Sequence, residues 1–398
     1  MTSPFPGKRT TGGPTTRDGH PIRPVFSHDI FIQQRFGGVS RYFAELHRAL
    51  RRLGVPSTIL APIHRCELLD RGPGVVGVRI PRSLQLKKTG MITIGAASEP
   101  VVLALLANMH KQVVLHRTYY SDVRPTLRTA TAVTVYDMIH ERHRNAFFTS
   151  ADPTTSQKRL WCERADVIFA ISHHTKAELV DAFGIAPDRI VVTHLGVTKV
   201  EPDQATVAAL HESSPFLLYV GSRAMYKNFD HLIKAFARST APRSGVRIVA
   251  FGGGPSTPIE RRHLEVSGVS NLVTFTDGDD ARLAAHYAGA TALVYPSLDE
   301  GFGLPPLEAM LHGCPVGASL GGAIPEIVAD AALLFDPTSE EQMAGAIDSL
   351  LSDSDCRSRL VKTGYERVAK FTWNSTARTT LEGYRAALSH ADVRHSSR

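Results

Sequence analysis

Short apolar runs alternate with amphipathic stretches along nearly the whole chain. Runs of this length are typical of strands in parallel sheets that are buried on both faces, and the stretches between them are typical of covering helices. In the first half the pattern predicts strands at Pro24–Phe26, Ser57–Ala61, Val75–Ile80, Val113–His116, Ala132–Tyr136, Val167–Ile171 and Ile190–Thr193. In the second half it predicts strands at Phe216–Val220, Arg247–Phe251, Leu272–Phe275, Ala292–Tyr295, Val316–Ala318 and Ala332–Phe335. The chain is therefore expected to adopt an α/β fold with two doubly wound parallel sheets.

The stretch Val197–Ser214 is polar, lacks a strand pattern and lies between the two series of strands. A chain of 398 residues exceeds what one hydrophobic core usually organises, so two domains are expected. Helices are predicted at Val39–Leu53, Lys176–Phe183, Asp230–Arg238, Ala281–Tyr287 and Asn374–Leu388. The expected division is a flexible leader at 1–21, a first domain at 22–200, a second domain at 201–372, and a terminal helix with a basic tail at 373–398.

The most apolar stretch of the chain is Met91–Ala107, which Glu99 and Pro100 interrupt. We interpret it as a strand or turn followed by a buried helix, because a membrane span needs about 20 uninterrupted apolar residues. The four cysteines are scattered without a C-x-x-C pair, which indicates a reducing compartment and argues against a disulfide framework or a zinc site. No signal peptide is recognisable, so a cytoplasmic location is expected.

Charge is unevenly distributed between the two halves. Residues 1–200 contain 27 Lys and Arg against 15 Asp and Glu, a difference of +12, whereas residues 201–398 contain 18 against 23, a difference of −5. Such asymmetry indicates a polyanionic partner for the basic half. Nucleic acid is not expected because no nucleic-acid-binding motif is present, and an anionic membrane surface or a lipid phosphate fits better. The predicted contact stretch contains Arg79, Arg82, Lys87 and Lys88 among Ile80, Leu84 and Leu86; the alternative is a solvated loop.

Two carboxylates, Glu300 and Glu308, stand eight positions apart around a Gly-Phe-Gly turn. Two prolines follow the turn and suit the first positions of a helix, where a missing N–H costs nothing. The amides of Gly303 and Leu304 would then point out of a positive helix end that can bind phosphate. The pair can bracket a long polar ligand. Taken singly, Glu308 could instead only favour a helix N-terminus, and Glu300 could be a solvated loop acid.

Two further loops join a strand to a helix and carry groups that can bind an anion. Gly37 and Gly38 follow the first predicted strand and open a helix, so backbone can approach a bound anion closely; a simple tight turn is the alternative. Gly221 begins a loop with Arg223 and Lys227 after the first strand of the second domain. Two cations at such a place can neutralise a diphosphate leaving group, although they could also form a solvated pair.

Other polar residues give weaker indications. Asp137 follows Tyr136 at the end of a central strand and could orient an acceptor hydroxyl or cap the next turn. His116 is expected to be a satisfied core residue. The histidines of His140-Glu141-Arg142-His143 are three positions apart rather than the four of a helical zinc motif, so no metal site is expected.

The E-x7-E spacing, the Arg223/Lys227 loop and Gly37–Tyr42 resemble the retaining GT-B glycosyltransferases of family 4, which include bacterial mannosyl- and rhamnosyltransferases. The resemblance extends from about Phe26 to Tyr384. It implies two Rossmann-like domains facing across a cleft, with the terminal helix crossing back to the first. It also implies a reaction without metal or cofactor, in which a hexose moves from a nucleotide sugar to a hydroxyl.

The resemblance also implies roles for individual residues. Glu300 would hold hydroxyls of the transferred sugar, Glu308 the ribose, and Arg223 and Lys227 the diphosphate. The remaining donor contacts would come from Gly37, Gly38, Gly221, Phe302, Gly303 and Leu304, and the acceptor side would include Tyr136 and Asp137, with Tyr136 in place of the usual histidine. No enzymic nucleophile is found, so same-face attack is the expected mechanism.

The residues of the Gly-Gly-Val-Ser-Arg-Tyr-Phe stretch most resemble those of enzymes that build cell-surface polysaccharide on lipid-linked acceptors. GDP-mannose is the first expected donor, followed by GDP- or dTDP-linked deoxyhexoses, and the location would be cytoplasmic, peripheral to the membrane. The alternatives are a nucleotide-sugar epimerase or a phosphorolytic enzyme on the same fold, and a non-catalytic module that binds a sugar nucleotide or a membrane.

Overall fold

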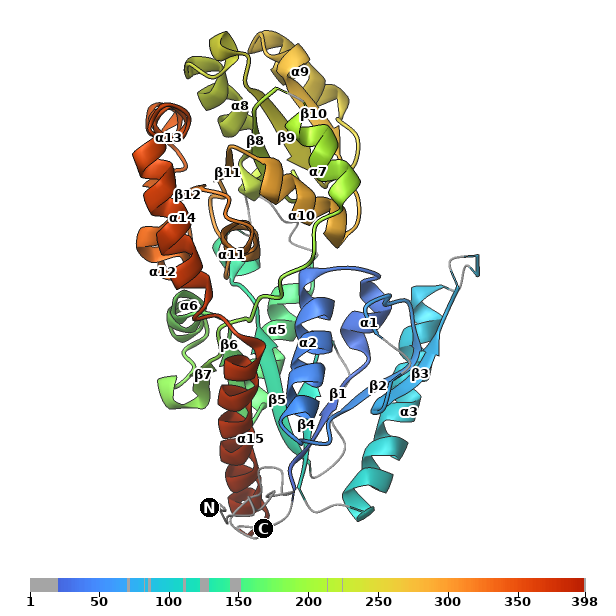
Figure 1. Ribbon diagram of the computed structural model, residues 1–398. Coiled ribbons are helices and arrows are strands. Elements are labelled where there is room, and N and C mark those ends of the chain that lie inside the picture. Colours follow the sequence, from blue (N-terminus) through green and yellow to red (C-terminus); the bar gives the residue numbers. More distant parts are fainter. Residues whose placement is uncertain are drawn as a thin grey trace, which may run out of the picture.

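The computed structural model describes residues 21–69, 72–81, 83–84, 87–109, 112–121, 129–143, 152–212, 214–223 and 225–396. They form two parallel β-sheets, each in its own α/β domain (Figure 1). The first sheet has the order β3-β2-β1-β4-β5-β6-β7: β1 (Arg23–Phe26), β2 (Thr58–His64), β3 (Val75–Arg79), β4 (Val113–Arg117), β5 (Ala130–Val135), β6 (Val167–Ala170) and β7 (Ile190–Val192). The second has the order β10-β9-β8-β11-β12-β13: β8 (Phe216–Val220), β9 (Arg247–Phe251), β10 (Val273–Thr276), β11 (Ala292–Tyr295), β12 (Val316–Ser319) and β13 (Leu333–Phe335). Each strand predicted from the sequence is present, so the predicted fold class is confirmed.

Helices cover the two sheets. In the first domain they are α1 (Asp29–Gln33), α2 (Gly38–Arg52), α3 (Lys88–Met109), α4 (Ile139–Arg142), α5 (Thr154–Arg164) and α6 (His173–Phe183). In the second they are α7 (Gln204–His211), α8 (Phe229–Arg238), α9 (Pro258–Val266), α10 (Asp280–Gly289), α11 (Leu304–Leu311), α12 (Ile324–Val328), α13 (Glu340–Ser352) and α14 (Ser354–Val368). Short 3-10 turns lie at Pro187–Arg189, Met225–Lys227, Pro242–Ser244, Ser270–Leu272 and Ala329–Ala331.

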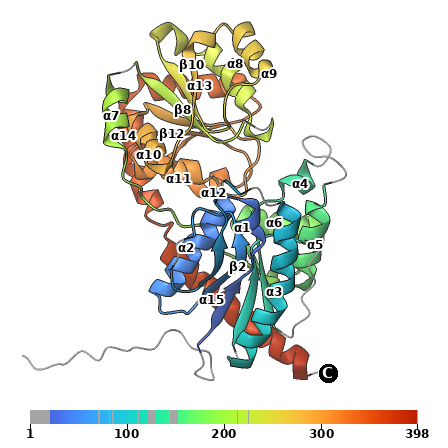
Figure 2. The same ribbon diagram turned by 90° about the vertical axis from the view of Figure 1, so that its right-hand side faces the viewer.

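Strand order determines where ligands can bind. In each sheet the order reverses beside the first strand of the domain, between β1 and β4 and between β8 and β11. In open α/β sheets a crevice forms at such a switch point, outside the carboxyl ends of the strands. The Lys227 loop leaves β8 and the Glu300 turn leaves β11, whereas the Gly37-Gly38 turn is separated from β1 by the short helix α1, which the sequence analysis did not predict. Figure 2 shows α11 and α12 of the second domain at its boundary with the first.

The last helix, α15 (Trp373–Ser396), returns to the first domain, as the resemblance implied. It packs against α2 and against strands β4 to β7 (Figure 1). Trp373 Nε1 donates to Thr198 Oγ1 at 3.1 Å. His116 is fully buried between the Tyr384 hydroxyl at 2.7 Å and Thr134 Oγ1 at 2.8 Å, and the prediction of a satisfied core histidine is confirmed.

The structure corrects the prediction for Met91–Ala107. This stretch belongs to one continuous helix, α3, in which Pro100 is accommodated. One side of α3 packs through Leu103 on strand residues of the first sheet, whereas Ile94, Val101 and Leu105 on the other side are exposed. By length and composition alone, 19 of its residues with a mean hydropathy of 1.6 could cross a membrane, and 22% of them are buried. Of the other predicted features, the leader up to residue 20, and Arg82 and Leu86, lie outside the described residues.

Candidate active site

The turn after β11 and the loop after β8 bring two opposite charges together. Lys227 Nζ donates to Glu300 Oε1 at 2.5 Å, and the Tyr295 hydroxyl donates to the same oxygen at 2.7 Å. The side chains of Lys227 and Glu300 are 16% and 11% exposed. A cation and an acid that were 73 positions apart in the sequence therefore face each other at the switch point of the second sheet.

Asn228 fixes the two loops relative to each other. Its backbone is left-handed, with φ of 60°, a conformation that asparagine tolerates better than most residues. Its side-chain amide donates to the carbonyl oxygens of Pro296 at 3.0 Å and Pro337 at 2.7 Å. The Leu298 amide donates to the Tyr226 carbonyl at 2.8 Å. Sequence analysis did not identify Asn228, although its position directly after Lys227 could have indicated a role in the loop.

Two glycines allow the Glu300 turn to lie against its neighbours. A Cβ atom on Gly301 would be 1.7 Å from the carbonyl oxygen of Tyr136, which belongs to the other domain. Gly322 has a φ of +57°, and a Cβ there would be 2.4 Å from the backbone of Glu300. The turn therefore contacts the first domain directly, and Glu300 lies at the boundary between the domains.

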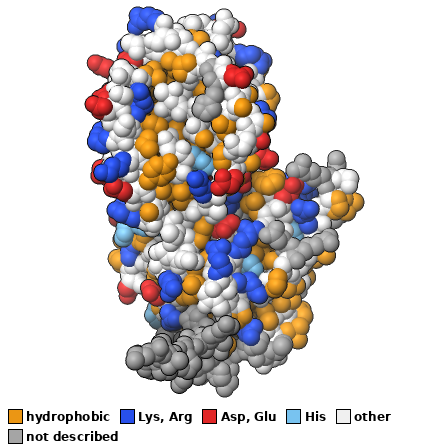
Figure 3. All heavy atoms as spheres, viewed as in Figure 1, with side chains coloured by type: hydrophobic (Ala, Val, Ile, Leu, Met, Phe, Trp, Pro, Cys, Tyr) orange, Lys and Arg blue, Asp and Glu red, His pale blue; other side chains and the backbone are white. Residues whose placement is uncertain are grey.

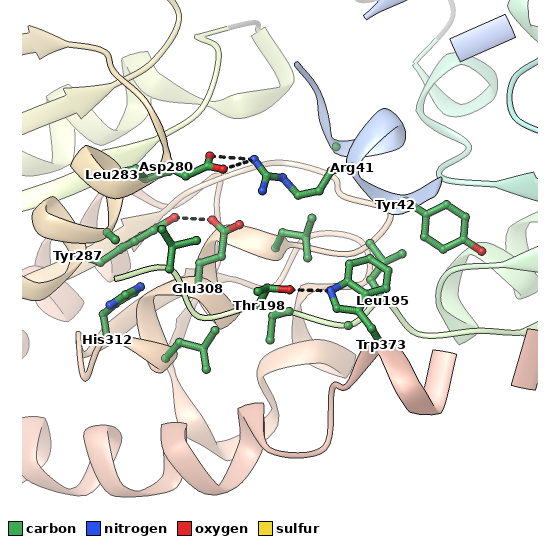
Figure 4. A pocket seen from close by; sticks show the side chains of 17 residues that line it. Arg41, Tyr42, Leu195, Thr198, Asp280, Leu283, Tyr287, Glu308, His312 and Trp373 are labelled. Atoms are coloured by element: carbon green, nitrogen blue, oxygen red, sulfur yellow. Dashed lines mark hydrogen bonds and ion pairs between the residues drawn. The ribbon is translucent and has the colours of Figure 1, made fainter. Parts of the chain in front are cut away.

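Glu308 lies in α11 and lines a pocket between the domains (Figure 4). Gly303, with φ of 103°, precedes the helix, and the two prolines occupy its first positions as predicted. The Tyr287 hydroxyl donates to Glu308 Oε2 at 3.0 Å. The pocket is lined by Gly38, Arg41, Tyr42, Leu195, Gly196, Val197, Thr198, Val200, Asp280, Leu283, Ala284, Tyr287, Leu304, Glu308, Leu311, His312 and Trp373. Thus the second acid of the motif faces the helix start that follows Gly37-Gly38.

Electrostatics differ at the two acids. Burial lowers the pKa of Lys227, but the Glu300 carboxylate outweighs it and the pKa lies above its ordinary value. Lys227 is therefore charged at neutral pH. Burial raises the pKa of Glu308, and the nearby Asp280 carboxylate raises it further, while the hydrogen bond from Tyr287 and the charge of Arg41 oppose the rise. The environment of Glu308 thus favours contact with hydroxyl groups over contact with another anion.

Arg223 is not placed as the sequence analysis expected. Its guanidinium donates to Glu260 Oε1 at 2.6 Å and to the carbonyl oxygens of Gly252 at 2.7 Å, Gly254 at 3.0 Å and Pro255 at 2.9 Å. Its side chain is only 4% exposed. The reason is that three consecutive glycines in the loop after β9, Gly252 to Gly254, have positive φ angles and turn their carbonyls toward the guanidinium. Arg223 therefore supports the loop, and Lys227 alone of the two predicted cations reaches Glu300.

Two side chains predicted for the site point elsewhere. Tyr136 is buried and donates to the Thr118 carbonyl at 3.3 Å, and burial raises its pKa well above the ordinary value. Its side chain therefore does not present a hydroxyl to an acceptor. The Phe302 ring is also buried, 5.8 Å from the ring of Phe371, so only its backbone remains available to a ligand.

The remaining predicted positions have local roles that leave them near the cleft. Asp137 Oδ1 accepts from the Ile139 amide at 3.2 Å, which is the capping alternative, and its side chain is 34% exposed. Gly37 and Gly38 form the start of α2, with open space where a Cβ of Gly38 would be. Gly221 has a φ of +137°, which favours glycine at the end of β8.

Two carboxylates of the second domain bind the first domain, and the sequence analysis missed both. Asp299 is buried beside Glu300, and one of its oxygens lies 3.1 Å from His143 Nε2 and 3.5 Å from Arg142 Nη1. Glu326 accepts from His194 Nε2 at 2.7 Å and from the amides of His173 at 2.9 Å and His174 at 3.0 Å, at the start of α6. These contacts hold the domains together beside the cleft.

Within the described parts of the chain, one group of side chains is compact enough to hold a metal ion, namely His173, His194 and Glu326. Both oxygens of Glu326 already accept hydrogen bonds. The arrangement is thus explained by the contact between the domains. The His140–His143 stretch contributes no member to this group.

Comparisons of the sequence with known proteins give a consistent result. The family described as "Glycosyl transferases group 1" matches residues 201–367, and "Glycosyltransferase Family 4" matches residues 36–199. D-inositol 3-phosphate glycosyltransferase of Corynebacterium glutamicum is 31% identical, over 64% of this chain and 68% of the relative. The same enzyme of Frankia alni is 29% identical over 90% and 96%. O-antigen chain mannosyltransferase B of Escherichia coli is 28% identical over 89% and 97%.

Solved structures share the fold. Sucrose-phosphate synthase of Thermosynechococcus elongatus has a TM-score of 0.73 and 21% identity, covering 92% of this chain and 98% of its own. The Anabaena protein Alr3699/HepE, solved in complex with UDP-glucose, has a TM-score of 0.65 and 15% identity, covering 91% and 99%. These similarities bear on the fold alone.

Proposed function

The chain belongs to glycosyltransferase family 4 and is a glycosyltransferase, and from this we propose that it is a retaining, metal-independent hexosyltransferase. It transfers a hexose from a nucleotide sugar to a saccharide or lipid-linked acceptor in the synthesis of cell-surface polysaccharide. The relative named as an O-antigen chain mannosyltransferase supports mannose as the sugar, and GDP-mannose is the donor that we propose first. UDP-glucose, with which one structural neighbour was solved, is included among the donors to be tested.

One observation carries the proposal. Lys227 and Glu300 meet at the switch point of the second sheet, in the turn that contacts the first domain. Glu308 lies in α11, the helix that follows the Glu300 turn, and it lines a pocket that faces the beginning of α2. A nucleotide sugar placed along this line would present its ribose to Glu308, its diphosphate to Lys227 and the amide of Gly38, and its hexose to Glu300.

The proposed reaction needs little covalent chemistry from the protein. The bond between the anomeric carbon and the diphosphate oxygen breaks, and its electron pair leaves with the diphosphate. The acceptor oxygen bonds to the same face of the anomeric carbon, and its proton passes to the departing phosphate oxygen. Lys227 would stabilise the negative charge that develops on that oxygen, and Glu300 would hold the sugar in position.

The experiment that tests the proposal measures transfer directly. Purified full-length protein is incubated with GDP-mannose, UDP-glucose or dTDP-rhamnose and with lipid-linked saccharides, and the released nucleoside diphosphate is quantified. Two results would support the proposal: release of nucleoside diphosphate only when an acceptor is present, and an axial linkage, observed by NMR, in the product formed from GDP-mannose. Interconversion of donors without acceptor would indicate an epimerase instead. An inverted product would exclude retention, and loss of activity in EDTA would exclude metal independence.

Replacing Glu308 with alanine is expected to raise the donor KM by about tenfold or more, the scale of losing a hydrogen bond to a charged group. The value of kcat should change little, because contacts to the ribose are alike in the ground state and the transition state. Tyr287→Phe is the matched control, since it removes only the hydroxyl that orients Glu308 and should give a smaller rise. A collapse of kcat in Glu308→Ala with unchanged KM would contradict the ribose role.

We also propose that the enzyme lies at the inner face of the membrane. Ile94, Val101 and Leu105 on α3 are 46 to 60% exposed, and Val78 on the neighbouring edge of the sheet is 65% exposed. Figure 3 shows hydrophobic side chains over β3 and α3 beside Lys and Arg side chains over α2. An exposed apolar face bordered by positive charge suits the surface of an anionic bilayer.

A vesicle flotation experiment tests the membrane proposal. The protein should float with vesicles of phosphatidylglycerol and remain below with phosphatidylcholine. The variant Val101→Glu/Leu105→Glu should lose flotation, and Lys87→Ala/Lys88→Ala should reduce partitioning by roughly fivefold per residue, as expected for about 1 kcal/mol per basic residue near the surface. Lys362→Ala/Lys370→Ala, which removes the same number of charges from exposed positions in α14 and directly after it, serves as the charge-matched control. Equal flotation of all variants would contradict the proposal.

A further inference from the structure

Arg41 and Asp280 join the two domains across the pocket that contains Glu308. Arg41 lies in the first turn of α2, and Asp280 is the first residue of α10. Arg41 Nη2 lies 2.8 Å from both carboxylate oxygens of Asp280. Figure 4 shows the two side chains meeting above Glu308, with each coming from a different side of the pocket.

The charges around this pocket are unbalanced. Among the residues that line it, Arg41 is the only lysine or arginine, whereas Asp280 and Glu308 are both acids. A phosphate group that entered here would be attracted by Arg41 and by the amides at the start of α2, and it would be repelled by Asp280. Arginine binds phosphate through paired hydrogen bonds in the same geometry in which it binds a carboxylate.

The pocket is also too small for a nucleotide while the ion pair is formed. Its volume is about 40 Å³, whereas pockets that enclose small ligands usually measure roughly 300–1,000 Å³. Arg41 and Asp280 are 31% and 49% exposed, and an ion pair so accessible to water is weak and easily exchanged. A donor could therefore enter when these two side chains part and the domains separate slightly.

We infer that Arg41 exchanges partners during donor binding, from Asp280 in the empty enzyme to the diphosphate of the donor in the loaded enzyme. Asp280 is then an internal competitor that occupies the arginine and keeps the pocket closed. This inference rests on the proposed function, because it takes the donor to be a nucleoside diphosphate sugar. It assigns Arg41 and Asp280 opposite effects on one binding equilibrium, although the two form a single ion pair.

The opposite effects give the test. Binding of GDP, UDP, ADP and dTDP to the full-length protein is measured by titration calorimetry, with guanosine and uridine as probes that lack phosphate. Arg41→Ala should weaken binding of the preferred nucleoside diphosphate by about tenfold or more, the scale of a lost charge-assisted hydrogen bond. Asp280→Asn should tighten it by about two- to fivefold, the scale of releasing an exposed ion pair. Neither change should alter nucleoside binding.

Arg52→Ala is the matched control, because it removes the same charge from an exposed position of the same helix and should leave binding unchanged. If both Arg41→Ala and Asp280→Asn weaken binding, the pair serves only to hold the domains together and the inference is overturned. No effect of Arg41→Ala, or no binding of any nucleoside diphosphate, would also overturn it. Opposite shifts without any sugar transfer would leave the role of Arg41 in place and disprove the proposed function instead.

Discussion

Replacing Lys227 with alanine is expected to lower kcat by about 10²–10³, the scale of losing one group that stabilises developing charge. The ammonium is charged and almost buried beside Glu300, so little water screens its electrostatic interaction with a bound diphosphate. Its Nζ lies 2.5 Å from Glu300 Oε1, the distance of a close ion pair. When a diphosphate leaves, the same ammonium would face the increasing negative charge, whereas in the ground state it is already balanced by the carboxylate. The effect should therefore fall on kcat more than on the donor KM.

Two controls separate this role from a structural one. Lys234→Ala removes a charge from α8, where Lys234 is 53% exposed and lies 3.7 Å from Glu340, and it should leave kcat unchanged. Lys227→Arg keeps the charge and should retain more activity than Lys227→Ala. Thermal unfolding of each variant shows whether the fold is intact. A decrease of less than threefold in kcat for a folded Lys227→Ala would remove Lys227 from the mechanism.

The central strands could be predicted from the sequence because they are buried on both faces. The run Phe216–Val220 becomes β8 with every residue buried, and Ala292–Tyr295 becomes β11 in the same way. A strand buried on both faces must be continuously apolar, so composition alone fixes its position. The turn and the helix start between Glu300 and Glu308 could be predicted because they depend on about a dozen neighbouring residues.

Features that depend on distant residues could not be predicted. Arg223 follows β8, where a cation of the site is expected. Its guanidinium, however, donates to the carbonyl oxygens of Gly252 and Gly254, two glycines with a left-handed backbone. Tyr136 ends its strand at the cleft, yet its ring turns into the core. In α3, half of the apolar residues face solvent, and no local pattern distinguishes such a helix from one buried on all sides. In each case the outcome depends on what packs against the residue, which the sequence pattern does not contain.

The buried charges at the end of β4 also depend on distant residues. Arg117 has no exposed surface, and it donates to Glu99 at 2.5 Å, to Asp29 at 2.8 Å and to Ser121 Oγ at 2.6 Å. Its guanidinium also stacks on the Trp161 ring at 4.7 Å. Asp29 and Glu99 come from α1 and α3, so one arginine joins two helices to the sheet.

Arg117→Met is accordingly expected to destabilise the first domain by about 3–5 kcal/mol, because it leaves two carboxylates buried without their cation. For a domain of this size the melting temperature should fall by roughly 6–20 °C. Denaturant unfolding monitored by the fluorescence of Trp161 in a Trp373→Phe background measures the change, since the Trp161 ring contacts Arg117.

A second substitution tests whether charge is the cause. Glu99→Leu/Arg117→Met removes one of the two carboxylates that Arg117→Met leaves unpaired. The other, Asp29, retains its hydrogen bond from Ser27 Oγ at 2.5 Å. If the loss comes from unpaired buried charge, the double variant should be more stable than Arg117→Met alone, because apolar replacements of buried ion networks can restore stability. If the loss comes instead from packing against Trp161, the two substitutions should add and the double variant should be the less stable. The order of these two stabilities therefore decides between the electrostatic account and a purely steric one.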